Sequence, residues 1–170
     1  RRLYAGLHLR INESKSAVAK ATQRTFLGFA FWVASGKAVR LRVSPRALGA
    51  MKDRVRRITR RTRGRSLPQI CADLRSYLGG WKGYFRLAET PRVFSDLDEW
   101  IRHRLRAVQL KQWKRGRTIY RELRARGLSS LRAAQVAANA RSWWRNSAMA
   151  IHGALPNSLF ATLGVPRLGA

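Results

Sequence analysis

Acidic residues are scarce in this sequence, which holds eight Asp and Glu against 36 Lys and Arg and so carries a net charge of +28. Such a charge repels itself in a compact state unless an anionic partner neutralises it, and nucleic acid is the usual partner. The one acidic cluster, Asp96, Asp98 and Glu99, stands near the start of a predicted helix, where carboxylates favour the positive end of the helix dipole. We therefore predict no carboxylate-based catalytic or metal site.

Metal-binding and reactive side chains are rare as well. Cys71 is the single cysteine, which excludes an intramolecular disulfide and a cysteine-based zinc site and fits a reducing compartment. It lies in a helical apolar pattern, so we interpret it as a core thiol. The histidines, His8, His103 and His152, are far apart and share no metal-ligand spacing. No phosphate-binding or dinucleotide-binding glycine pattern occurs, and we expect no catalytic residue, no metal and no cofactor in this chain.

Long hydrophobic runs are also missing. The longest apolar run, from Phe26 to Ala34, is far shorter than the ~20 residues of a membrane span, and the N-terminus lacks the apolar core of a signal peptide. We therefore predict a cytoplasmic protein with no membrane partner. The sequence begins at Arg1 and reads from its first residues as the middle of an element, so we expect a C-terminal piece of a longer protein. Its oligomeric state is left open.

Apolar and aromatic residues, by contrast, are plentiful. The chain is 45% hydrophobic and contains six Trp, six Phe and four Tyr, whereas disordered basic tails contain few aromatic or apolar residues. We therefore expect a folded protein with a buried core and its charges on the surface. Residues 1–43 carry a net charge of +8 and residues 44–170 one of +20, so both parts should contact the polyanion.

The N-terminal residues alternate between apolar and polar in the manner of β-strands. Residues 7–11 predict a short strand followed by a polar turn, and residues 26–43 predict a β-hairpin with one basic face. At Ser44-Pro45 the apolar period changes from two to 3.6, which indicates the start of a helix. We therefore predict an α+β fold in two domains: a short β-hairpin module over 1–43 and a mainly α-helical domain over 44–170.

Capping residues and glycines divide the helical domain. A helix begins where a side chain can accept a hydrogen bond from the first free N–H groups, and it commonly ends at glycine. The predicted helices run from Pro45 to a stop at Gly64, from a capping box at Ser66 and Gln69 to Gly79-Gly80, from Pro91 and Ser95 to Gly116, from there to Gly127, over 129–141, and from Pro156 onward.

Aromatic residues interleaved with positive charge are the candidate binding groups, because Lys and Arg neutralise phosphates and aromatic rings stack on exposed bases. Trp81 and Phe85 continue the apolar pattern of their helix, so packing is the favoured interpretation for them. Trp113 and one of Trp143 and Trp144 are evenly balanced between packing and stacking. The residues predicted to contact phosphates are Arg54, Arg57, Arg60, Arg61, Arg102, Arg106, Lys111 and Lys114, and those predicted to stack on bases are Trp113 and Tyr84.

Several segments resemble a known family. Asn12-Glu13-Ser14-Lys15-Ser16 and Phe26-Leu27-Gly28-Phe29 are similar to the last palm segments of a group II intron reverse transcriptase. The resemblance implies that Lys15 lies near the polymerase site and that Leu27 and Gly28 lead out of the palm toward the primer. The segments that resemble the thumb or X domain, also called the maturase-specific domain, are Trp81-Lys82-Gly83-Tyr84-Phe85, residues 98–106, Lys111-Gln112-Trp113-Lys114, Trp143-Trp144 and Leu155-Pro156-Asn157.

The resemblance implies an RNA-binding maturase module whose partner is group II intron RNA. Such a module assists splicing by stabilising the folded intron, since the ribozyme performs the transesterification in this family, and in an intact parent it also grips the RNA/DNA template–primer duplex. No Tyr-x-Asp-Asp motif occurs in this chain, so Mg²⁺ is expected only in the intact parent polymerase. This chain alone should not synthesise DNA.

Two alternatives stay open. In the first, the chain is the C-terminal fragment of an active RNA-directed DNA polymerase, which the upstream sequence would reveal. In the second, it is a helix-turn-helix DNA-binding protein whose recognition helix spans 129–141, although the alanine-rich face of that segment is more typical of close helix packing.

Overall fold

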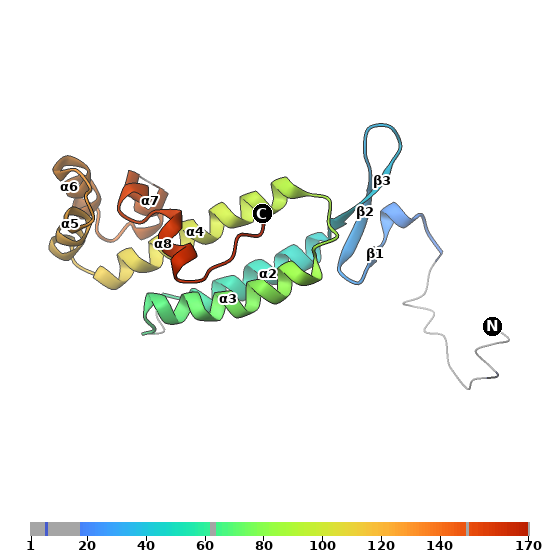
Figure 1. The fold of residues 1–170 in the computed structure, drawn as a ribbon, viewed down its shortest axis with the longest axis horizontal. Helices are drawn as coiled ribbons and strands as arrows, with labels where there is room; N and C mark the ends of the chain where they lie inside the picture. Colours follow the sequence, from blue (N-terminus) through green and yellow to red (C-terminus); the bar gives the residue numbers. More distant parts are fainter. Residues whose placement is uncertain (1–5, 7–17, 62–63, 149, 170) are drawn as a thin grey trace.

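The protein forms an elongated structure with a small sheet at one end and helices along the rest (Figure 1). The structure is a computed structural model that describes residues 6, 18–61, 64–148 and 150–169. Helices α2, α3 and α4 run side by side through the middle, and α5 and α6 lie at the end far from the sheet. The predicted α+β class is confirmed. The strand predicted over 7–11 and the polar turn after it lie outside the described residues.

The sheet has three antiparallel strands in the order β1, β2, β3. The predicted hairpin is the β2–β3 pair, in which Phe29 stands opposite Val43 and Val33 opposite Val39. The expected basic face is present in part, since Arg40 and Arg42 are exposed. The strands are β1 (Thr25–Phe26), β2 (Phe29–Val33) and β3 (Val39–Val43), and the short 3₁₀ helix η1 (Ala21–Gln23) precedes them.

A two-residue turn joins β1 to β2 and brings the sheet against the helices. Its residues, Leu27 and Gly28, have φ angles of 50° and 80°, the left-handed conformation that suits a tight hairpin turn. A Cβ atom added to Gly28 would lie 3.1 Å from the ring of Phe85, so glycine also leaves room for that ring. The carbonyl of Gly28 accepts a hydrogen bond of 2.8 Å from the backbone N–H of Ser44, the residue that caps the first long helix.

Helix α2 (Pro45–Ile58) begins as predicted, because the Ser44 hydroxyl accepts a hydrogen bond from the backbone N–H of Ala47. The prediction that it continues to Gly64 is wrong. At its C-terminal end, the Thr59 hydroxyl donates to the Val55 carbonyl at 2.7 Å and accepts from the Arg104 guanidinium at 2.8 Å. Thr59 is therefore held by a neighbouring helix, and the chain leaves helical geometry there.

Helix α3 (Leu67–Tyr84) begins with the predicted capping box, in which Ser66 and Gln69 exchange side-chain and backbone hydrogen bonds. The predicted end at Gly79-Gly80 is wrong, since the helix passes through both glycines. Beyond them Trp81 and Phe85 are buried, with ring centroids 4.7 Å apart. Burial of two large rings outweighs a cost of about 1 kcal/mol for each glycine inside a helix.

Helix α4 (Pro91–Trp113) is the longest, and its predicted stripe of Leu97, Ile101, Leu105 and Val108 is buried. The following residue, Lys114, ends it with a φ of 58°. One later helix, α7, has no counterpart in the predictions. The remaining elements are α5 (Gly116–Ala125), α6 (Ser130–Ala138), α7 (Trp143–Ala148), η2 (Ala150–Gly153) and α8 (Asn157–Thr162).

A continuous apolar core joins β3, α2, α3, α4 and the C-terminal elements. Cys71 belongs to it and is fully buried, which confirms its prediction as a core thiol. Burial raises the pKa of Cys71 to about 11, so the thiol is protonated at neutral pH. Within the described ranges, every helix falls short of the length and apolarity that crossing a membrane requires.

Candidate nucleic-acid interface

The end of α2 and the loop after it present a row of exposed arginines. Arg54 and Arg57 project from α2, whose opposite face buries Met51 and Val55 in the core. Arg60 and Arg61 follow the last turn of the helix and are exposed too. Four residues that the sequence predicts as phosphate contacts are thus exposed along the end of α2 and the loop after it.

This surface leads into a cationic pocket between the α2–α3 loop and the C-terminal end of α4. The pocket has a volume of about 330 Å³, and its lining includes Ser66 and Gln112. Gln112 donates a hydrogen bond of 2.8 Å to the carbonyl of Arg65 and so ties the loop to α4. Five cationic residues line it: Arg60, Arg61, Arg65, Lys111 and Lys114.

One of these cations is already neutralised. Arg65 forms a bidentate ion pair with Asp73 of α3. Among the described residues, no ion pair joins a carboxylate to the side chains of the four other cations. The pocket therefore keeps a strong local excess of positive charge, which favours an anionic ligand.

Trp143 of α7 lies beside two of the pocket cations. The Nζ atom of Lys111 is 3.9 Å from the centroid of its ring, and the guanidinium carbon of Arg61 is 5.5 Å from it. The negative face of an indole attracts such cations. Trp143 thus holds two positive charges close together at the edge of the pocket.

Trp144, the next residue, faces a different neighbour. Its ring stacks on the imidazole of His103 at a centroid distance of 3.8 Å, and the His103 ring nitrogen Nε2 lies 2.9 Å from the Trp144 carbonyl oxygen. The side chain is nevertheless 43% exposed. The sequence did not indicate which of Trp143 and Trp144 packs and which is exposed. The basic residues on both sides of this pair were the only indication of a binding role.

The two residues predicted to stack on bases are far from equivalent. Trp113 is half-buried, and the guanidinium of Arg126 lies over its ring at 5.1 Å. Tyr84 is 53% exposed and stacks on Phe29, and its hydroxyl donates to the carbonyl of Leu27 at 2.9 Å. Tyr84 ends α3 next to the sheet, whereas the cationic pocket lies at the other end of that helix. Tyr84 and the pocket are therefore not part of one site.

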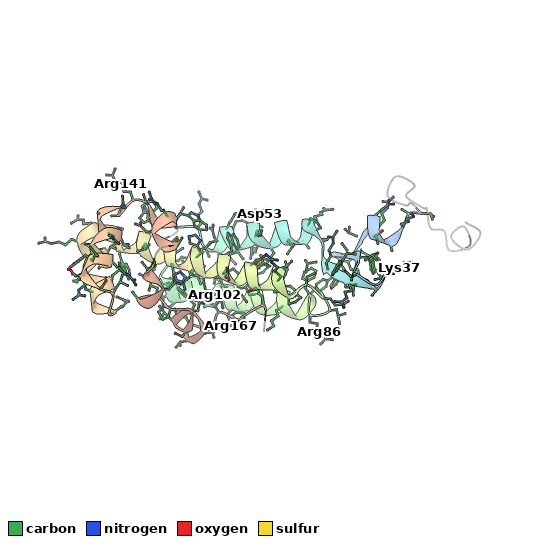
Figure 2. All side chains as sticks on the ribbon, turned by 90° about the horizontal axis from the view of Figure 1, so that it is seen from above. Lys37, Asp53, Arg86, Arg102, Arg141 and Arg167 are labelled. Atoms are coloured by element: carbon green, nitrogen blue, oxygen red, sulfur yellow. The ribbon has the colours of Figure 1, made fainter. Side chains whose placement is uncertain are left out.

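The prediction that Arg102 and Arg106 contact phosphates is corrected by their burial, because only 3% and 2% of their surfaces are exposed. Arg102 pairs with Asp98 at 2.9 Å and donates to the carbonyl of Pro166 at 3.0 Å. Arg106 donates to the carbonyl of Leu155 at 2.9 Å. Burial lowers the pKa of Arg106 to about 10, with the charge of Arg102 as the second cause, so it stays charged at neutral pH. Both guanidinium groups hold the C-terminal segment on α4 (Figure 2 labels Arg102).

One member of the acidic cluster, Asp98, has a role other than the one predicted. The first turn of α4 holds no acidic residue, so dipole stabilisation is not its main function. Instead, the Asp98 carboxylate accepts hydrogen bonds from the backbone N–H groups of Leu168 and Gly169 at 2.8 and 3.1 Å. In the part of the chain that the structure describes, no group of three or more His, Cys, Asp and Glu could hold a metal ion.

The remaining predicted residues lie near the sheet or outside the described ranges. Leu27 and Gly28 form the β1–β2 turn, and the side chain of Leu27 is 65% exposed. Lys15 lies outside the described residues. The sheet turn is at the opposite end of α3 from the cationic pocket, so these two regions are separate surfaces.

The exposed basic side chains of the candidate interface are carried by a scaffold of α2, α3 and α4. The family model of the group II intron, maturase-specific domain matches residues 48–127. This segment, just under half of the chain, is similar to the group II intron maturase-specific domain. It runs from the first turns of α2 through α5 to Gly127. No curated protein matches the chain.

The matched segment contains the whole lining of the cationic pocket, from Arg60 to Lys114. Trp143 and Trp144 come after it in sequence and pack back against it through α4. The two tryptophans near the cationic pocket therefore lie beyond the family match.

Proposed function

We propose that this chain binds structured RNA of a group II intron through the surface formed by Arg54, Arg57, Arg60, Arg61, Lys111 and Lys114. The observation that carries the proposal is the local concentration of cations within the segment that matches the maturase-specific domain. Among the described residues, no carboxylate forms an ion pair with any of these six cations. Phosphates of a folded RNA supply the missing negative charge, and binding releases the counterions that the RNA had condensed.

In this proposal the protein assists splicing by stabilising the folded intron. Phosphate contacts at several points of the RNA favour compact conformations in which RNA strands lie close together, because the protein offsets their mutual repulsion. The protein needs no acid–base chemistry for this task, since the intron RNA itself carries out the reaction. The exposed cations from Arg54 to Arg61 provide the surface for such contacts.

A charge-reversal variant tests the proposal directly. Replacing Arg54, Arg57, Arg60 and Arg61 with Glu should lower affinity for intron RNA at moderate salt by at least about a hundredfold, because attractive contacts become repulsive. The control reverses four exposed arginines scattered over other elements, Arg24, Arg92, Arg132 and Arg141. Both variants have the same net charge. If the control lost as much affinity as the test variant, the interface would be a general charge effect and not the α2 surface.

Competition with duplex DNA separates this function from the helix-turn-helix alternative. Helix α6 buries Ala133 and Val136, and it approaches the start of α5 so closely that a Cβ on Gly116 would lie 2.7 Å from the carbonyl oxygen of Ala137. Close packing of this kind favours a structural role for α6. We expect structured intron RNA to resist competition by duplex DNA, whereas a protein that reads DNA would prefer its DNA site.

The proposal extends to the template–primer duplex that an intact parent polymerase would hold. The β1–β2 turn supports this extension, because Leu27 is exposed and its carbonyl is tied to Tyr84 of α3. A rigid turn joined to the helical scaffold can guide a duplex that leaves the palm. Fusing the chain to a complete palm should increase affinity for an RNA/DNA duplex, and substitution of Tyr84 by Phe should reduce that gain.

A further inference from the structure

We propose that the cationic pocket and Trp144 together form a site for an unpaired RNA nucleotide, with the phosphate in the pocket and the base on the indole. This inference rests on the proposed RNA-binding function and deepens it by naming the element of RNA that the site selects. Three features carry it: the charge of the pocket, the way its cations are held, and the exposed aromatic ring next to it.

The charge of the pocket calls for an anion of phosphate size. Arg60, Arg61, Lys111 and Lys114 line a cavity of about 330 Å³, and the Asp73 carboxylate is engaged by Arg65. Cations gathered in this way repel one another. A phosphate group would remove this repulsion.

Trp143 positions two of the cations. Its ring lies under the ammonium of Lys111 at 3.9 Å and near the guanidinium of Arg61 at 5.5 Å, so the two charges converge from different elements. Because the indole limits the freedom of both side chains before a ligand arrives, less conformational entropy is lost on binding. Positioning of this kind is typical of a formed site and not of a solvated basic face.

Trp144 offers the surface for a base. One face of its ring is covered by His103 at 3.8 Å, yet 43% of the side chain remains exposed. Trp144 lies near the pocket, because Arg61 and Val108 line both the cationic pocket and a small cavity that Trp144 also lines. Groups for a phosphate contact and for a stacking contact thus lie on neighbouring parts of the protein.

The combination favours an unpaired nucleotide over a duplex. Inside a duplex both faces of a base are covered by its neighbours, whereas a bulged or looped-out base can stack on an aromatic side chain. A duplex would use the cations and leave Trp144 without a partner. An unpaired nucleotide uses both parts of the site.

The test measures binding of the full chain to three RNA hairpins that share one stem. The first has a single bulged uridine, the second has an abasic nucleotide at that position, and the third is fully paired. We expect the bulged hairpin to bind about tenfold more tightly than the abasic one, since stacking of a base on an aromatic ring contributes roughly a factor of ten. The abasic and paired hairpins should bind similarly.

Two variants assign this preference to the site. Trp144→Ala should bring the bulged and abasic hairpins to equal affinity, whereas Trp144→Phe, which keeps an aromatic face, should retain most of the difference. The double variant Arg61→Gln, Lys111→Gln should weaken binding of all three hairpins. Circular dichroism before and after heating establishes that each variant is folded.

The outcomes separate this inference from the proposed function. Equal affinity of the wild type for bulged and abasic hairpins, or a preference that survives in Trp144→Ala, would overturn the nucleotide site while salt-dependent RNA binding persisted. Absence of salt-dependent binding to any of the hairpins would instead reject the proposed function. A preference that disappears in Trp144→Ala and is kept in Trp144→Phe supports the site.

Discussion

Asp98 and Arg102 lie one turn apart on α4 and form an ion pair of 2.9 Å that holds the C-terminal segment on that helix. The carboxylate of Asp98 accepts hydrogen bonds from the backbone of Leu168 and Gly169, and Arg102 donates to the carbonyl of Pro166. Each charge therefore has a partner on the same helix and another in the segment that follows α8. From the sequence, both residues would be expected to be charges on the surface. In the structure they act together as a clamp that holds the C-terminal segment on α4.

Removing one charge of this clamp should destabilise the protein strongly. In Arg102→Met the Asp98 carboxylate loses its cation in a site where only 16% of its side chain is exposed. Loss of one partner of a buried pair costs about 3 kcal/mol or more, and urea unfolding followed by circular dichroism measures this free energy.

The matched control for that variant is Arg121→Met, which breaks an exposed pair with Glu122 at 3.2 Å. Exposed pairs contribute about 0–1 kcal/mol, so the control should unfold nearly as the wild type does. Equal losses in the two variants would contradict the assignment of Arg102 as a buried clamp.

Replacing Gly28 with Ala should cost more than the same change at Gly36. Both glycines have left-handed φ angles, 80° and 88°, so each substitution introduces backbone strain of about 1 kcal/mol. Of the two, only Gly28 would bring the new Cβ against another group, the Phe85 ring at 3.1 Å. We expect Gly28→Ala to lower the free energy of unfolding by about 1 kcal/mol more than Gly36→Ala. Identical effects would show that the turn does not pack on Phe85 as described.

The raised pKa of Cys71 predicts a loss of stability in alkaline solution. The thiol stays protonated in the folded state up to about pH 11, whereas the unfolded chain loses this proton near 9.0. The unfolded state thus binds fewer protons between these values, and stability falls as the pH rises through this window. The advantage of the wild type over Cys71→Ala in urea unfolding should shrink by roughly 2 kcal/mol between about pH 8 and pH 11. A constant difference would mean that the thiol is accessible to water.

The start of each long helix could be predicted from the sequence because the signals are local. Ser44 and Ser66 lie directly before Pro45 and Leu67, and each accepts a hydrogen bond from a backbone N–H three residues later. These interactions involve neighbouring residues alone. The ends of α2 and α3 depend on tertiary contacts, such as that between Thr59 and Arg104, which the sequence does not reveal.

The candidate interface could be predicted in part. Arg54, Arg57, Arg60 and Arg61 are exposed as expected, because their spacing leaves a narrow apolar stripe on the other face of α2. Arg102 was predicted in the same way but is buried. It is covered by the C-terminal segment, which lies more than sixty residues further along the chain and includes Val165 and Pro166. The one local signal was Asp98, four residues before it, which indicates an ion pair along the helix.

The measurement that tests the central claim most directly is the salt dependence of RNA binding. Affinity for a folded group II intron RNA would be measured across a range of salt concentrations for the wild type and for a variant with Arg54, Arg57, Arg60 and Arg61 all changed to Gln. If these residues bind phosphates, the slope of log affinity against log salt should become shallower by about three, at roughly 0.7–0.9 for each phosphate that an arginine neutralises. An unchanged slope would contradict the claim that this surface binds RNA.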